Sequence, residues 1–232
     1  MAIELTWLGH ATWLIDVKST RVGNHRLLLD PFLDDSPTAP IKSDAVQADF
    51  ILISHGHFDH VADAAKIAKR TGAMVISNYE ICEWLAKQGV EKTHPHNLGG
   101  GSNQPFGRVQ LTLAHHSSML PDGSNGGSAS GFLLTIEGKK LYFACDTAMF
   151  YDMKLIGEHG LDVAVLPIGD QFTMGPADSI RAIQLLAPAR VVPSHYDTWP
   201  PIHQDAAAWS ARVEGETDAE PCVVAPGGKI TI

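Results

Sequence analysis

The sequence contains few cysteines. Cys82, Cys145 and Cys222 are its three cysteines in 232 residues, and they are widely spaced with no CxxC pair among them. Small disulfide-stapled folds use an even number of cysteines, and cysteine-based structural zinc sites use CxxC pairs. The spacing excludes both, so we expect three reduced thiols and place Cys145 in the core, facing away from Asp146.

Long apolar runs and positive charge are also scarce. No apolar run approaches the roughly 18 residues of a membrane helix, and the amino terminus lacks the pattern of a signal peptide. Lys and Arg number 17 against 26 Asp and Glu, which gives a net charge of −9. This balance repels nucleic acid and anionic membranes. We therefore expect a cytoplasmic protein with a small-molecule substrate and no nucleic-acid or membrane partner, in an oligomeric state that stays open.

The chain has no low-complexity tract and no block of like charges. Apolar residues make up 44% and charged residues 19%, which is ordinary globular composition. A length of 232 residues suits one α/β unit. We predict a single domain over residues 1–232.

The order of apolar patterns predicts the fold class. Both halves of the chain run from antiparallel strands to strand-helix units, which favours two mixed β-sheets packed face to face with helices outside. Asn78 is the predicted cap of the second helix, Gly89 its stop, and Glu137-Gly138 a hairpin turn. The predicted strands cover 3–8, 11–17, 25–30, 49–54, 73–77, 108–114, 131–137, 139–145, 162–168, 189–194, 221–225 and 229–232, and the helices cover 61–70, 78–89, 176–187 and 204–212.

The segment "ISHGHFDH" crowds three histidines and an aspartate behind a buried strand. In α/β folds, ligand-binding groups gather beyond the carboxyl ends of strands. His55 and His57 face the same side of an extended chain, so they suit one ion. Asp59 and His60 lie where the chain turns into a helix and suit a second ion. Imidazole and carboxylate donors favour Zn²⁺, Mn²⁺ or Fe²⁺.

Further donors follow three other predicted strands. His115 and His116 end the strand at 108–114, Asp146 ends the strand at 139–145, and His195 ends the strand at 189–194. Like the 55–60 cluster, each of them follows the carboxyl end of a predicted strand. We therefore expect them to complete two adjacent metal sites.

The arrangement H-x-H-x-D-H, with a later His, Asp and His, resembles the metallo-β-lactamase superfamily. The segments "WLGHATWLI", "LLLDPFL", "ISHGHFDH", "HNLGGG", "AHHSS", "CDT", "LPIGDQFTMGP" and "PSHYDTWPPI" resemble its small, single-domain UlaG-like hydrolases. The resemblance implies a four-layer αββα sandwich. It also implies a first metal on His55, His57 and His116, a second metal on Asp59, His60 and His195, and Asp146 bridging both.

Only one of His115 and His116 can face the site, because adjacent strand residues point to opposite sides. The family pattern places the ligand directly before the Ser pair, which favours His116 and leaves His115 beside the site or in the core.

Several residues keep two interpretations. His10 either lines the pocket, where it donates a proton to the leaving group or hydrogen-bonds substrate, or is a structural histidine. Asp30 either accepts a hydrogen bond from a liganding imidazole or caps the turn before Pro31. The loop with Asp170, Thr173 and Met174 either shapes the pocket floor or, as we favour, is a tight turn. His96 is expected in a Gly-rich loop, as a structural or pocket-edge residue.

The predicted chemistry is hydrolysis by water activated between two divalent metal ions. Asp59, Asp146 and His10 are the predicted catalytic residues, and Ser117 lacks the G-x-S-x-G context of a nucleophile. The most suitable metal is zinc, with manganese, nickel or iron compatible. The substrate is a small ester, lactone, amide or phosphodiester, with lactones favoured by the resemblance, beneath a mobile Gly- and Ser-rich rim at 121–131.

Two alternatives share the fold. A redox diiron protein of this superfamily resembles the chain but has Glu where His57 stands and a fused flavin domain. A metal-binding module without turnover is the other alternative, although degenerate members usually lose ligands and this chain keeps the whole set.

Overall fold

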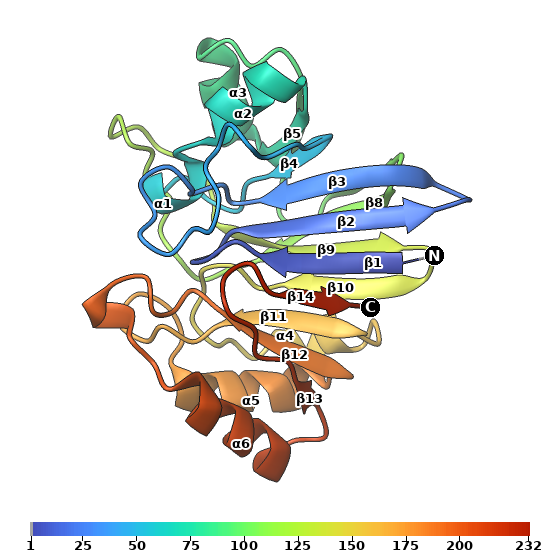
Figure 1. The fold of residues 1–232 in the computed structure, drawn as a ribbon, viewed down its shortest axis with the longest axis vertical. Coiled ribbons are helices and arrows are strands. Elements are labelled where there is room, and N and C mark those ends of the chain that lie inside the picture. Colours follow the sequence, from blue (N-terminus) through green and yellow to red (C-terminus); the bar gives the residue numbers. More distant parts are fainter. Residues whose placement is uncertain (1) are drawn as a thin grey trace.

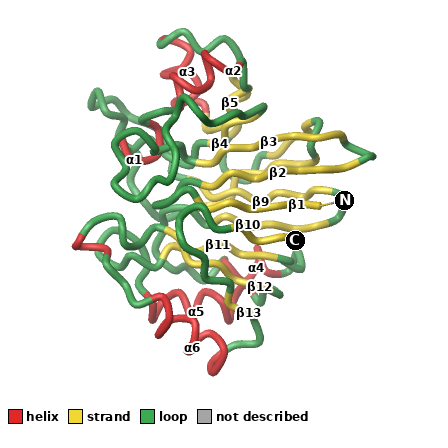
Figure 2. The backbone as a smooth tube through the Cα atoms, in the orientation of Figure 1, coloured by secondary structure: helices red, strands yellow, loops and turns green. Residues whose placement is uncertain are grey.

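The computed structural model describes residues 2–232 and forms two seven-stranded sheets packed face to face. Helices cover the outer face of each sheet, as Figure 1 shows with α2 and α3 at one end and α5 and α6 at the other. Figure 2 shows strands in the middle of the molecule and long loops along one edge. The predicted αββα sandwich is confirmed.

The first sheet has the order β14-β1-β2-β3-β4-β5-β6, with antiparallel pairing from β14 to β3 and parallel pairing from β3 to β6. Its strands are β1 (Ala2–Trp7), β2 (Trp13–Ser19), β3 (Gly23–Leu29), β4 (Phe50–Leu52), β5 (Met74–Asn78), β6 (Thr93–His96) and β14 (Lys229–Thr231). The predicted meander at the start of the chain is therefore present.

The second sheet repeats this plan in the order β13-β12-β11-β10-β9-β8-β7, antiparallel from β7 to β10 and parallel from β10 to β13. Its strands are β7 (Gly101–Gln104), β8 (Gly107–Leu113), β9 (Ser130–Ile136), β10 (Lys139–Phe143), β11 (Val163–Pro167), β12 (Arg190–Ser194) and β13 (Glu220–Pro221). The hairpin between β9 and β10 turns at Glu137 and Gly138, whose φ angles are 48° and 90°. Positive φ at both residues matches the twist of a tight hairpin.

The helices are α1 (Phe58–Val61), α2 (Ala64–Thr71), α3 (Tyr79–Lys87), α4 (Met153–Gly157), α5 (Pro176–Leu186) and α6 (Ala206–Glu216), and a 3₁₀ turn covers Pro200–Ile202. Asn78 caps α3 as predicted, because its side chain accepts a hydrogen bond from the Ile81 amide at 2.9 Å. Among the described residues, no helix is long and apolar enough to cross a membrane.

Two expectations about local structure are wrong. The predicted strand at 221–225 is reduced to the two residues of β13, and the segment with His96 ends strand β6 instead of lying in a loop. Strand β7 and helix α4 had no sequence signal. Each of these elements is short or polar, so neighbouring strands and packing decide its conformation more than its own residues do.

The main apolar core lies between the sheets and contains Trp13, Phe132 and Phe143. A smaller cluster lies beneath α2 and α3 and contains Ile67 and Ile81. Because both sheets are buried on their facing sides, the strands are held rigidly and their carboxyl-end loops are fixed relative to one another. The site is built at that edge.

Candidate metal centre

The predicted metal-binding residues converge at the edge where α1 lies, at the left of Figure 1. His55 and His57 follow β4, and Asp59 and His60 lie in α1. Strands β8, β10 and β12 all run in one direction, so the residues that follow them reach the same edge. These residues are His116, Asp146 and His195 respectively.

The predicted ligands fall into two groups of donor atoms, and a third group joins Asp30 to His55 and His60. One group holds His55, His57 and His116, and the other holds His10, Asp59, His60 and His195; within each group the donor atoms lie within 4.8 Å of one another. The carboxylate of Asp146 lies between the groups. Its Oδ2 is 3.0 Å from Nε2 of His195, 3.4 Å from Nε2 of His60, 3.6 Å from Nε2 of His116 and 3.9 Å from Nε2 of His55.

Four buried polar atoms of this centre make no hydrogen bond among the described residues. They are Nε2 of His60, Oδ1 of Asp146, and Nδ1 and Nε2 of His195. Buried polar atoms are nearly always partnered. A divalent cation accepts lone pairs from both imidazole and carboxylate, so the donor set fits a metal ion.

Charges oppose one another across the buried part of the centre. Burial acts to raise the pKa of Asp146, but the imidazoles of His195 and His60 outweigh it and hold that pKa well below its usual range. Burial acts to lower the pKa of His60, but nearby carboxylates, Asp146 foremost, raise it well above the usual value. The centre therefore holds a carboxylate that stays ionised at neutral pH.

The three histidines of the first group are held neutral. Burial lowers the pKa of His55 well below its usual value, with the charge of His60 adding to the effect. Burial also lowers the pKa values of His57 and His116. A neutral imidazole offers a lone pair to a metal without first losing a proton.

Asp30 orients two of the imidazoles. Its Oδ2 accepts a hydrogen bond from Nδ1 of His60 at 2.9 Å and from the Ser54 hydroxyl at 2.6 Å. The Ser54 oxygen is in turn 2.9 Å from Nδ1 of His55. Because Ser54 donates to Asp30, it accepts from His55, and Nε2 of both histidines faces the centre, where that of His55 is 3.0 Å from Nδ1 of His57. Of the two interpretations of Asp30, the structure supports the one in which its carboxylate accepts a hydrogen bond from an imidazole.

His10 is fully buried and connects the two sheets. Its Nδ1 is 2.8 Å from the Thr198 hydroxyl and its Nε2 is 3.0 Å from Oδ2 of Asp59. Its backbone oxygen accepts hydrogen bonds from Nε1 of Trp7, the Ser194 hydroxyl and the His195 amide. Burial and the neighbouring His195 lower the pKa of His10 to about 3, so its ring is neutral near pH 7.

Backbone strain is concentrated around the donors. Four residues at this edge are in the left-handed region, with φ of 51° at His10, 44° at Asp30, 53° at Cys145 and 52° at His195. Such conformations cost about 1–3 kcal/mol each for residues other than glycine and persist where the surrounding structure enforces them. Their clustering indicates that the surrounding structure enforces these backbone conformations and thereby directs the donor side chains toward the centre.

His116, and not His115, belongs to the donor cluster. His115 is exposed, and its ring packs edge-on against Phe150 with centroids 5.2 Å apart. The loop after His116 is tied to the 55–57 segment, since the Gly56 amide donates to the Ser118 hydroxyl at 3.0 Å. A Cβ at Gly56 would lie 3.2 Å from the Leu120 side chain, so glycine allows this close approach.

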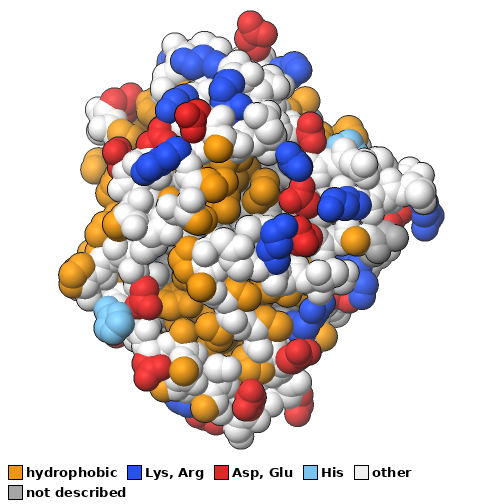
Figure 3. Space-filling model, viewed as in Figure 1, with side chains coloured by type: hydrophobic (Ala, Val, Ile, Leu, Met, Phe, Trp, Pro, Cys, Tyr) orange, Lys and Arg blue, Asp and Glu red, His pale blue; other side chains and the backbone are white. Residues whose placement is uncertain are grey.

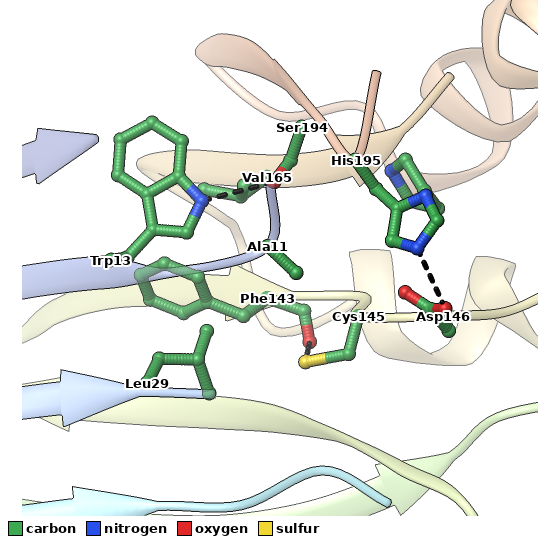
Figure 4. Close-up of a pocket in the computed structure, with 10 residues that line it drawn as sticks. Ala11, Trp13, Leu29, Phe143, Cys145, Asp146, Val165, Ser194 and His195 are labelled. Carbon is green, nitrogen blue, oxygen red and sulfur yellow. Dashed lines mark hydrogen bonds and ion pairs between the residues drawn. The ribbon is translucent and has the colours of Figure 1, made fainter. Parts of the chain in front are cut away.

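Cys145 faces away from the donors, as expected. In Figure 4 it lies between Asp146 and the apolar side chains of Trp13, Leu29 and Phe143, which line a narrow cavity with it. Its Sγ is 3.7 Å from the Phe143 oxygen, and burial raises the pKa of the thiol well above its usual value. The thiol is therefore protonated and acts as packing.

The remaining sequence candidates are structural. Asp170 has φ of 71° and its oxygen accepts from the Thr173 amide at 2.7 Å, which makes the favoured tight turn. His96 bonds Ser102 through Nε2 and belongs to neither donor group. The predicted mobile rim at 121–131 is anchored by side chains, because Asn78 donates to the oxygens of Gly126 and Ser128.

Sequence reasoning missed Ser54 and Thr198. Ser54 directly precedes His55 at the strand end, which is a usable signal. Thr198 lies three residues after His195 but meets His10 across 188 positions of the chain, and no local pattern predicts such a contact.

Comparison with known proteins assigns the family. Residues 25–196 match the model of the β-lactamase superfamily domain. A metal-dependent hydrolase (UPF0173) of Heliobacterium modesticaldum is 46% identical, covering 99% of this chain and 98% of its own length, and one of Thermus thermophilus is 44% identical, covering 97% of both. Igni18 of Ignicoccus hospitalis, described as a novel metallo hydrolase, has a TM-score of 0.89 at 33% identity, over 100% of this chain and 99% of its own. By sequence and by fold, the chain belongs to the metallo-β-lactamase superfamily of metal-dependent hydrolases.

Proposed function

We propose that the protein hydrolyses a small ester, lactone, amide or phosphodiester, with lactones as the first candidates, at a centre of two divalent metal ions. The supporting observation is the position of Asp146. Its Oδ2 lies within 4 Å of histidines from both donor groups, so one carboxylate can serve two ions. The UlaG-like subgroup, which suggested lactones, stays a prediction from the sequence.

The proposed ligands follow the two donor groups. His55, His57 and His116 hold the first ion, Asp59, His60 and His195 hold the second, and Asp146 lies between them. Zinc suits this imidazole-rich set best, and manganese, nickel or iron is compatible with it. When bound, such ions supply Lewis-acid activation of water and of the substrate's carbonyl or phosphoryl group.

The supporting residues hold the ligands in one tautomer. Asp30 accepts from Nδ1 of His60, and Ser54 accepts from Nδ1 of His55, so Nε2 of each ring is directed to the centre; His55 is neutral there, and His60 gives up its Nε2 proton when it binds a metal ion. This arrangement requires no proton to be moved before metal binding at His55. It also resists rotation of either ring.

His10 positions Asp59 in this proposal. Asp59 is ionised, because the charge of His60 and the hydrogen bond from His10 outweigh its burial and lower its pKa. Nε2 of the neutral His10 therefore donates to Asp59, and Nδ1 accepts from Thr198. Both nitrogens are engaged, so His10 acts through Asp59 and leaves the leaving-group proton to another donor.

The test combines metal content with a hydrolysis screen. Purified protein is expected to bind close to two equivalents of Zn²⁺ or Mn²⁺ and to hydrolyse at least one of a set of lactones, thioesters, amides and phosphodiesters. Asp59→Ala is expected to keep one equivalent and to lose activity. Asp178→Ala, which changes an exposed carboxylate on α5, is the matched control and is expected to behave as the unchanged protein.

Full activity in Asp59→Ala would contradict the proposal. Visible absorption and redox turnover of iron-loaded protein, with no hydrolysis of any substrate, would point instead to the diiron alternative.

A further inference from the structure

Aromatic side chains form a wall directly beside the second donor group. Phe32, Phe58 and Trp199 meet with ring centroids 5.8 Å apart for Phe32–Phe58, 5.8 Å for Phe32–Trp199 and 6.1 Å for Phe58–Trp199. We call these three residues the aromatic wall. The ring of Trp199 lies 5.0 Å from that of His10, a member of the donor group. The wall therefore borders the centre.

Two of the three wall residues are open to solvent, and Phe32 is buried behind them. Phe58 is 56% exposed although it stands between His57 and Asp59 in the chain, and Trp199 is partly exposed. Met119, in the loop after His116, is 62% exposed on the side of the first donor group. Exposing such large apolar side chains costs solvation free energy, so a patch of this kind commonly marks a binding surface.

Positive side chains are missing from the whole edge. The loops that carry or border the donors contain no Lys or Arg; they cover residues 8–12, 30–41, 53–63, 114–129, 144–153, 167–175 and 194–205. Of the cations next to these ranges in the sequence, Lys154 lies in α4, and two others are engaged elsewhere. Lys66 pairs with the carboxylate of Asp34 at 2.6 Å, and Lys42 donates to the Asp34 backbone oxygen at 2.7 Å.

The surface view agrees with this distribution. In Figure 3, Lys and Arg side chains gather at the top and the right of the molecule, whereas the lower left edge, toward the loops, shows apolar and acidic side chains, a histidine and uncoloured atoms. An anionic substituent that lies away from the metal ions would meet no basic side chain at the edge.

We infer that the substrate is an uncharged molecule that carries a flat aromatic or long alkyl group next to the scissile bond, and that phosphorylated or carboxylated analogues are excluded. This inference rests on the proposed hydrolysis at the same centre. The apolar group lies against Phe58 and Trp199, which directs the reactive carbonyl toward the donors. The aromatic wall supplies affinity, and the lack of cations supplies the selection against anions.

The experiment uses one lactone ring in three forms: unsubstituted, with a phenyl or hexyl substituent, and with a carboxymethyl substituent. With zinc-loaded protein, the phenyl and hexyl forms are expected to exceed the unsubstituted form in kcat/KM by about tenfold or more, a step that a pocket contact of this size supplies. The carboxymethyl form is expected to be the poorest.

The wall residues carry that preference. Phe58→Ala and Trp199→Ala are expected to lose most of it through a higher KM for the phenyl form, with a smaller change for the unsubstituted lactone. Trp199→Phe keeps a ring and should retain the preference. Leu155→Ala removes an equally exposed side chain from α4 and is the control. Phe58→Lys is expected to improve kcat/KM for the carboxymethyl form and to reduce it for the phenyl form.

Binding is measured in parallel without turnover, by calorimetry of the three lactones with Asp59→Ala. If no lactone is hydrolysed but the phenyl form binds best and the carboxymethyl form worst, the proposed function fails and the inference holds. Equal binding of all three forms would overturn the inference. A concentration-dependent dimer that Phe58→Ala dissociates, with lactone preference unchanged, would also overturn it, because the wall would then serve a second copy of the chain.

Discussion

The two groups of donors differ in how they are built. His60 and His195 are at most 2% exposed and lie with His10 behind a layer of hydrogen-bonded side chains. His57 and His116 are partly exposed and are reached from outside. We call the second group the buried group, because it is largely enclosed and fixes the geometry, and the first group the open group, because solvent reaches His57 and His116.

This difference indicates which contacts contribute to the stability of the fold and which contribute to turnover. In the buried group, removing a partner strands a polar atom away from water, which is expensive. In the open group, water replaces a lost partner at little cost. Removal of a hydrogen-bond partner should therefore lower stability mainly in the buried group and turnover mainly in the open group.

Asp146→Asn tests the residue that both groups share, and it should have the largest effect. Loss of the negative charge removes the contact between the groups, so we expect loss of both metal ions and hydrolysis at the level of the blank. Metal analysis and the hydrolysis assay check this. Two bound equivalents in Asp146→Asn would show that the groups do not depend on a common carboxylate.

Asp30→Ala tests the buried side of the centre, because Asp30 supports His60 directly and His55 through Ser54. The substitution leaves the Ser54 amide, the Ser54 hydroxyl and Nδ1 of His60 without their acceptor, so we expect a loss of about 3–5 kcal/mol in the free energy of unfolding. Denaturant unfolding of metal-free protein measures it. The control is Asp16→Ala, which breaks an exposed pair with Arg26 and should cost less than about 1 kcal/mol.

Thr198→Ala sharpens the comparison by changing one hydrogen bond behind the second ion. His10 would lose its partner at Nδ1 and hold Asp59 less firmly, so affinity for the second ion should fall about 10- to 100-fold. Titration against a chelator measures each ion, and the first should be unaffected. Thr198→Ser keeps the hydroxyl and should restore the affinity; equal weakening of both ions would argue against a role through Asp59.

Ser117→Ala should have the smallest effect, because it removes an exposed hydroxyl 3.2 Å from Nε2 of His57. We expect a stability change within about 0.5 kcal/mol and nearly unchanged kcat/KM. The neighbouring Ser118→Ala removes a buried hydroxyl that bonds Gly56 and Gly126, and should cost about 1 kcal/mol or more. A dead Ser117→Ala enzyme would indicate a serine nucleophile.

Local sequence signals predicted most of the regular structure. The Asn78 cap and the Glu137-Gly138 turn were recognised because each depends on neighbouring residues alone. Strand β6 was not predicted, and the strand predicted at 221–225 was too long, because pairing partners decide both elements. Single-domain organisation and a cytoplasmic location remain predictions from the sequence.

The sequence by itself determined the chemistry of the centre: imidazoles and carboxylates placed after strands that end at one edge. Only the tertiary structure decided that His116 points into the cluster, that Asp30 and Ser54 orient two rings, and that Phe58 and Trp199 form a wall beside them. The physical reason is distance along the chain. Periodicity and capping act over a few residues, whereas contacts such as His10 with Thr198 exist only after the two sheets have packed.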